Sequence, residues 1–199
     1  MLGRTYTRII ALFAQNKGYM NYDTLKNEGV TILQLRELEE NGILERFARG
    51  WYWCNDCGYV KPRDHRYIEV SLVDQEAVFC LDSACYLAGV KVSEPDTVKF
   101  AVPREDRRKF SFDFPAKRYF YTHMEAEYIT TKITEFGTYR YFAPERAVSD
   151  CLRETDKIEA ENLSAIKTYA SGHSIRVEEY RRFIRELKQK QRLQKQQAE

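Results

Sequence analysis

The first part of the chain has the hydrophobic spacing of three short helices. Apolar residues recur every three or four positions over residues 6–13, and Gly18 is well placed to end that helix. A second helix is expected over residues 22–28, ahead of another glycine. The third begins with Thr31 and Gln34, whose spacing predicts a capping box in which both side chains satisfy free backbone N–H groups.

A β-hairpin is expected directly after the third helix. Residues 43–48 form its first strand, Arg49-Gly50 suits a tight turn that requires positive φ at glycine, and residues 51–54 return as Trp-Tyr-Trp-Cys. Alternate strand residues face opposite sides, so the two tryptophans share one face and Tyr52 lies on the other face with the cysteine. Three helices followed by a hairpin is the element order of a winged helix-turn-helix.

The pattern changes at segment 61–66, which is polar, contains proline and suits a domain boundary. Residues 66–73 fit either a helix or a strand. Residues 80–90 predict a short helix that has Asp82 or Ser83 as its N-terminal cap and a glycine after its last turn.

Four later segments are rich in β-branched and aromatic residues and predict the strands of one sheet: 97–103, 117–123, 127–136 and 138–143. A helix that begins near Pro144 follows, because proline is favoured in the first turn of a helix. Two more helices are expected near 159–170 and 177–191. Runs of strands followed by runs of helices are typical of an α+β domain.

We therefore predict an α+β protein with three parts. Residues 1–62 form a winged helix-turn-helix DNA-binding domain, and residues 63–175 form a larger α+β domain with a mixed or antiparallel sheet. Residues 176–199 form a basic C-terminal helix and tail, in which positions 181–197 hold seven bases and one acid. Such a tail is either a solvated helix end or an arm that contacts phosphates or a partner.

Composition agrees with two small cores and a well-solvated surface. The chain has 199 residues, of which 43% are hydrophobic and 31% charged, and its mean hydropathy is −0.61. No stretch approaches the roughly 18 apolar residues that a membrane span needs, and the N-terminal sequence lacks a signal-peptide pattern. We expect a cytoplasmic protein with no membrane partner.

Two of the five cysteines raise the question of a metal site. Cys54 and Cys57 have the spacing of half a structural zinc site, which needs four ligands. Only His65 lies near them in sequence, and Cys80 and Cys85 complete a set only if the fold brings them close. An odd number of irregularly spaced cysteines favours reduced thiols. We therefore predict no metal and no cofactor.

The sequence offers little enzyme chemistry. The three histidines have no nucleophile beside them, and the chain lacks G-x-S-x-G, a phosphate-binding glycine loop and H-E-x-x-H. Asp96 and the charged segment 104–109 are faintly similar to metal-dependent nucleases. However, the strand bearing an acid and a lysine that such nucleases need to hold a cation is missing. We predict that the protein is not an enzyme.

The third predicted helix carries the candidate base contacts. If Leu35 and Leu38 point inward, steps of 100° per residue define the opposite face, with Ile32 and Gln34 on its flanks. That face holds Leu33, Arg36, Glu37 and Glu40. The two acids on that face would repel phosphates unless only the N-terminal half of the helix enters the groove.

Six residues are the candidate DNA contacts: Lys26, Thr31, Gln34, Arg36, Arg46 and Arg49. Glutamine and arginine of the third helix are natural partners of adenine and guanine, with the threonine beside them. The hairpin arginines and the lysine are candidates for phosphate or minor-groove contacts. The alternative for each is an ordinary solvated surface residue.

Four segments in order give the chain a resemblance to a known family. They are NGILERFARGWY at 41–52, FCLDSACYLAGV at 79–90, VKFAVPRE at 98–105 and APERAVSDCLRE at 143–154. In this order they resemble AbiEi-type antitoxins of type IV toxin–antitoxin systems, which act in abortive infection and phage resistance. Where the family has Ser-x-x-Ser-Ala, this chain reads Cys-Leu-Asp-Ser-Ala from Cys80.

The resemblance implies a repressor that is also an antitoxin. The N-terminal domain would bind inverted repeats in double-stranded promoter DNA of its own operon, with possible self-association on the DNA. The second domain would neutralise a nucleotidyltransferase-like toxin without a stable complex between them. The alternative from another class is a winged-helix module that dimerises or docks a protein partner, which the acids at 37, 39 and 40 favour. An enzymatic function is the third alternative, after these two.

Overall fold

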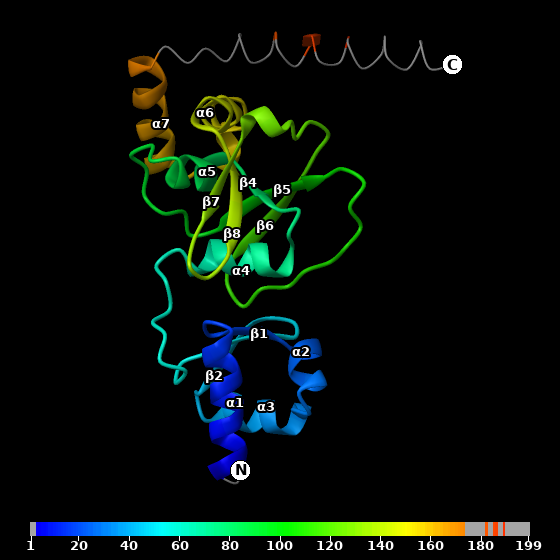
Figure 1. The fold of residues 1–199 in the computed structure, drawn as a ribbon. Helices are drawn as coiled ribbons and strands as arrows, with labels where there is room; N and C mark the ends of the chain where they lie inside the picture. Colours follow the sequence, from blue (N-terminus) through cyan, green and yellow to red (C-terminus); the bar gives the residue numbers. More distant parts are fainter. Residues whose placement is uncertain (1–2, 174–181, 183–184, 187–188, 190–199) are drawn as a thin grey trace, which may run out of the picture.

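A computed structural model describes residues 3–173 together with residues 182, 185, 186 and 189 (Figure 1). Within these residues the chain forms seven α-helices and two β-sheets, which confirms a mixed α+β fold. The helix predicted over 177–191 and the basic tail fall almost wholly outside the described residues. Among the described residues, no helix combines the length and the apolar character needed to cross a bilayer.

The N-terminal unit contains the three predicted helices and the predicted hairpin. Its elements are α1 (Gly3–Gln15), β1 (Tyr19–Asn21), α2 (Tyr22–Asn27), α3 (Ile32–Glu40), β2 (Leu44–Ala48) and β3 (Trp51–Cys54). The strands form an antiparallel sheet in the order β1-β3-β2. The capping box is confirmed, since Thr31 N donates to Gln34 Oε1 at 2.8 Å and Gln34 N donates to Thr31 Oγ1 at 3.3 Å.

Strand β3 separates two hydrophobic clusters, as its alternation predicted. Tyr52 and Cys54 pack with the helices of the N-terminal unit, around Ile9 and Phe13. Trp53 projects to the other side, into a cluster that also contains residues of the second unit. The strand therefore joins the N-terminal helices to the rest of the protein.

The second unit is a five-stranded sheet between two helical layers (Figure 1). Its elements are α4 (His65–Val73), β4 (Val78–Phe79), α5 (Leu81–Leu87), β5 (Val98–Pro103), β6 (Ala116–Tyr121), β7 (Ile129–Ile133), β8 (Thr138–Phe142), α6 (Pro144–Arg153) and α7 (Ala160–Gly172), with 3₁₀ turns η1 (Ala126–Tyr128) and η2 (Thr155–Lys157). The strand order is β6-β5-β4-β8-β7, with β4–β8 and β5–β6 parallel and the other pairs antiparallel. Helix α4 packs on one face, and α5, α6 and α7 pack on the other.

The structure corrects the predicted start of α5. We expected Asp82 or Ser83 as the N-terminal cap, but the cap position is Cys80, which makes no side-chain capping bond. Leu81 follows it with a φ of 54°, in the left-handed region that bulky residues rarely adopt. Asp82 lies inside the helix instead, where its Oδ1 accepts a hydrogen bond from Ser83 N at 3.0 Å. Both of its carboxylate oxygens also accept from the buried ammonium of Lys99, at 2.7 and 2.8 Å.

The two units share one hydrophobic cluster. Tyr19, Phe47 and Trp53 of the first unit pack with residues of α4 and of strands β4, β5 and β8. The backbone also connects them, because Asp113 N donates to Phe47 O at 2.9 Å and Ala48 forms a β-bridge with Phe112. The relative position of the units is therefore fixed by packing, in addition to the connection between β3 and α4.

An ionisable group is buried at this junction. Glu69 of α4 is fully buried, with Lys61 Nζ 3.0 Å from its Oε1 and the Tyr19 hydroxyl donating to the same oxygen at 3.4 Å. Burial raises the pKa of Glu69 from its ordinary value near 4.5 to about 7, and the lysine only partly offsets that shift. The folded protein thus binds a proton at Glu69 more tightly than the unfolded chain does.

Glu69→Gln is expected to stabilise the protein above pH 7. The wild type must ionise Glu69 in a buried site there, so its stability falls as pH rises from about 4.5 to 7, by up to about 3 kcal/mol from this group. We expect the variant to be more stable at pH 8 by about 1–3 kcal/mol and equal near pH 4.5. Urea denaturation at several pH values measures the difference. Glu45→Gln, at the exposed partner of the same Lys61, is the control, and a pH-independent difference would contradict the account.

Candidate nucleic-acid interface

Helix α3 has the inward and outward faces that its sequence predicts. Leu35 and Leu38 are buried, and Arg36 is exposed on the other side of the helix. Leu33 is also exposed, at 70% of its surface, and Ile32 beside it at 40%. The first half of the helix therefore presents apolar and basic groups to solvent.

The capping box limits what Gln34 can do at a base. A glutamine that recognises adenine uses both its amide oxygen and its amide nitrogen. Here the oxygen accepts a hydrogen bond from Thr31 N, and the Thr31 hydroxyl accepts one from Gln34 N. An adenine contact by Gln34 would have to break a hydrogen bond that stabilises the start of the helix. Of the three candidate base contacts on α3, Thr31, Gln34 and Arg36, the arginine is therefore the strongest.

Arg46 lies between acidic side chains. Its Nε is 3.6 Å from Glu39 Oε1 on α3 and 3.9 Å from Asp113 Oδ2. These pairs are exposed and weak, but they orient the guanidinium toward protein carboxylates. Of the two hairpin arginines, Arg46 is therefore the less suited to a phosphate.

Arg49 is exposed at the hairpin turn, as predicted, and makes no ion pair with the described residues. Gly50 has a φ of 74°, and its carbonyl accepts from Tyr22 N at 2.7 Å, which holds the turn at the first residue of α2. Lys26 is exposed near the other end of α2. Lys26 thus lies in the last turn of α2, and Thr31 and Gln34 lie at the start of α3. Arg49 precedes Gly50, which contacts the first residue of α2.

The cysteine pair has a local explanation. Cys54 and Cys57 are buried in the N-terminal cluster, and the Cys57 thiol donates to Cys54 O at 3.1 Å. Burial raises the pKa of Cys54 to about 12, which favours the thiol over the thiolate that binds metals. Cys80 and Cys85 belong to the cluster on the far side of the second sheet. Within the described part of the chain, no group of three or more His, Cys, Asp or Glu side chains is arranged to hold a metal.

No protein-family model matches this chain, and no curated protein matches it significantly in sequence.

Proposed function

We propose that the N-terminal unit is a winged helix-turn-helix that binds the promoter of its own operon, and that the protein is a repressor and antitoxin of a type IV toxin–antitoxin pair. The observation that carries the DNA-binding part is the exposed first half of α3. Its apolar side is anchored in the core by Leu35 and Leu38, while Arg36 faces solvent. A helix that is packed in the core on one side and exposes an arginine on the other suits major-groove recognition.

In this proposal α3 enters the groove by its N-terminal half. Arg36 donates two hydrogen bonds to a guanine, and the exposed Leu33 contacts a thymine methyl group. The acids of α3 lie at 37, 39 and 40, toward its other end, where they stay away from the phosphates. Lys26 and Arg49 neutralise phosphates on either side.

Arg49→Ala is expected to weaken DNA binding and to reduce its dependence on salt. Each phosphate contact releases about 0.9 of a counterion, so the slope of log K against log salt should fall by about 1 and the affinity by about tenfold at low salt. Fluorescence anisotropy titrations at four salt concentrations measure both quantities. Lys167→Ala, at an exposed lysine of α7, is the matched control and should leave the slope unchanged.

The antitoxin role rests on the family resemblance. We propose a functional partner of the nucleotidyltransferase-like class and no stable complex with it. The proposal requires a nucleotidyltransferase-like toxin gene in the same operon. Co-expression of the protein should restore growth of cells that express this toxin, while affinity purification of the tagged protein should recover no stoichiometric toxin. Failure to restore growth when both proteins accumulate would refute this part and leave the DNA-binding part standing.

The second candidate function is a protein-interaction or dimerisation module. Exposed Leu33 and Ile32 next to the acids of α3 favour it, because adjacent exposed apolar side chains mark interfaces. Sedimentation velocity distinguishes the two. A concentration-dependent dimer that Leu33→Lys abolishes, without any DNA binding by the wild type, would support this second function.

A further inference from the structure

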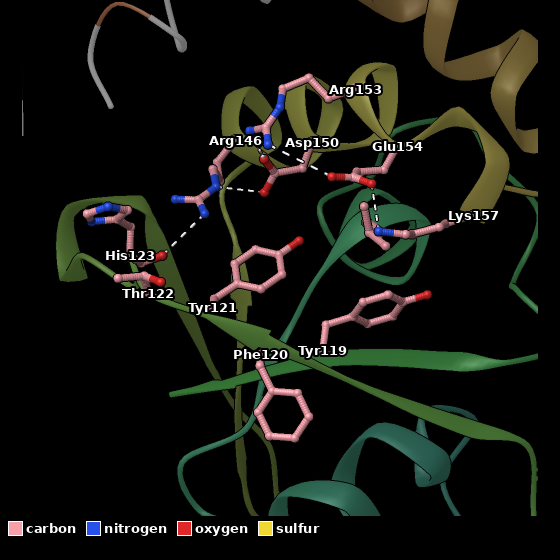
Figure 2. Close-up of a pocket in the computed structure, with 11 residues that line it drawn as sticks. Tyr119, Phe120, Tyr121, Thr122, His123, Arg146, Asp150, Arg153, Glu154 and Lys157 are labelled. Atoms are coloured by element: carbon pink, nitrogen blue, oxygen red, sulfur yellow. Dashed lines mark hydrogen bonds and ion pairs between the residues drawn. The ribbon is translucent and has the colours of Figure 1, made fainter. Parts of the chain in front are cut away.

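A cavity of about 300 Å³ lies between strand β6 and helix α6, on the face of the second sheet away from the N-terminal unit (Figure 2). Tyr119 and Tyr121 of β6 point into it, whereas Phe120 between them points to the opposite side. Arg146, Asp150 and Arg153 line it from α6, since residues four and three apart share one face of a helix. The cavity is thus aromatic on one wall and ionic on the other.

The inner end of the ionic wall is fixed by the fold. Arg146 is buried, donates to Asp150 Oδ2 at 2.7 Å and to His123 O at 3.2 Å, and places its guanidinium 4.5 Å from the ring centre of Phe142. Buried and hydrogen-bonded groups of this kind are costly to rearrange. We therefore assign this end a structural role.

The mouth of the cavity, unlike its inner end, is lined by partly exposed ion pairs. Glu154 holds its carboxylate between two cations, with Oε2 2.6 Å from Lys157 Nζ and Oε1 3.9 Å from an Arg153 nitrogen (Figure 2). All three side chains are about one-third exposed. Arg153 also donates to Asp150 Oδ1 at 3.3 Å, which orients its guanidinium at the mouth. Ion pairs at this exposure contribute little to stability, so the contacts of Glu154 are weak compared with those of Arg146.

The aromatic wall supplies a surface for an organic group. Tyr119 and Tyr121 form this wall with Leu81. The Tyr119 hydroxyl is buried and has no hydrogen-bond partner among the described residues. Burial raises the pKa of Tyr119 to about 12, so this hydroxyl remains a donor at neutral pH. Lys157 Nζ lies 5.5 Å from the ring centre of Tyr119, which places a mouth cation beside the aromatic wall.

We propose that this cavity binds a small organic anion. Its phosphate or carboxylate head takes the position of the Glu154 carboxylate between Arg153 and Lys157, and its flat apolar body lies against Tyr119 and Tyr121. Glu154 acts as an internal substitute for the ligand in the free protein. The cavity contains none of the candidate DNA contacts, so binding there does not depend on the proposed DNA interface.

Isothermal titration calorimetry of the full chain with phenyl phosphate tests the proposal. Inorganic phosphate, benzoate and phenol separate the contributions of the head and the ring. We expect phenyl phosphate to bind at least about tenfold more tightly than inorganic phosphate, and phenol to give no heat. A comparison of the affinities of benzoate and phenyl phosphate then shows whether the mouth of the cavity prefers a carboxylate or a phosphate.

Variants at the mouth locate the binding. Lys157→Ala is expected to weaken phenyl phosphate about tenfold, and Glu154→Gln, which removes the competing charge with little change of shape, to strengthen it about threefold. Lys167→Ala is the control outside the cavity. Wild-type affinity in Lys157→Ala, weaker binding in Glu154→Gln, or no heat from phenyl phosphate up to about 10 mM would each overturn the proposal.

Discussion

Replacing Gly18 by alanine is expected to lower the free energy of unfolding by about 3 kcal/mol or more. Gly18 has a φ of 89°, and an added Cβ would lie 2.3 Å from Cζ3 of Trp53. Trp53 is fully buried and is held by Tyr19, whose ring centre is 4.6 Å away, so the indole has no room to move. The variant combines overpacking with a backbone conformation that L-residues disfavour.

Gly29→Ala separates these two causes. Gly29 also has a positive φ, 75°, but its added Cβ would meet nothing within 4 Å. The Gly29→Ala substitution should therefore lower the free energy of unfolding only by the backbone penalty, about 1–2 kcal/mol. Urea denaturation of both variants, with the tryptophan fluorescence as the probe, gives the comparison. Equal losses of unfolding free energy in the two variants would show that the clash with Trp53 does not contribute to the destabilisation.

Replacing Asp82 by alanine is expected to destabilise the protein by about 3–5 kcal/mol, because it leaves the Lys99 ammonium buried without its partner. Asp82 is fully buried and Lys99 is 5% exposed, and each carboxylate oxygen receives a hydrogen bond from the lysine. The pair also joins α5 to β5, the neighbour of the central strand.

The double variant Asp82→Leu/Lys99→Met shows whether the loss comes from the uncompensated charge. Removal of both charges should recover most of the stability, since well-packed apolar residues often replace a buried ion pair at little cost. Lys132→Ala, which breaks a surface contact to Asp64 at 3.4 Å, should change stability by no more than about 0.5 kcal/mol. A double variant as unstable as Asp82→Ala would contradict the interpretation.

Local patterns predicted the N-terminal unit well. Thr31 and Gln34 form a capping box through bonds between neighbours in the chain, and the alternation of Trp53 and Tyr52 is a property of any strand. The four strands expected in the second unit are also present in one sheet. Such features depend on a few consecutive residues, which is why the sequence alone indicates them.

Long-range pairing accounts for what the sequence did not indicate. Strand β4 has two residues and exists only because β5 and β8 flank it. Asp82 suits a helix cap by position, but its partner Lys99 comes from another element, and no local pattern reveals that pair. The cavity likewise needs β6 and α6 side by side, so Glu154 and Tyr119 carry no signal of it in the sequence.

The predicted DNA contacts divide in the same way. Arg36 and Arg49 lie exposed where periodicity and turn chemistry put them. Gln34 is held by the capping box, which the sequence predicts. Arg46 pairs with Glu39, a contact that only the folded chain reveals.

We propose above that the exposed half of α3 recognises a specific DNA sequence. The most direct measurement is a fluorescence anisotropy titration of the full chain with the duplex from directly upstream of its own gene, in competition with a scrambled duplex of equal length and composition. We predict that the upstream duplex binds at least about 10³-fold more tightly, and that Arg36→Ala reduces this ratio by about tenfold or more. Equal affinities for the two duplexes would contradict the claim.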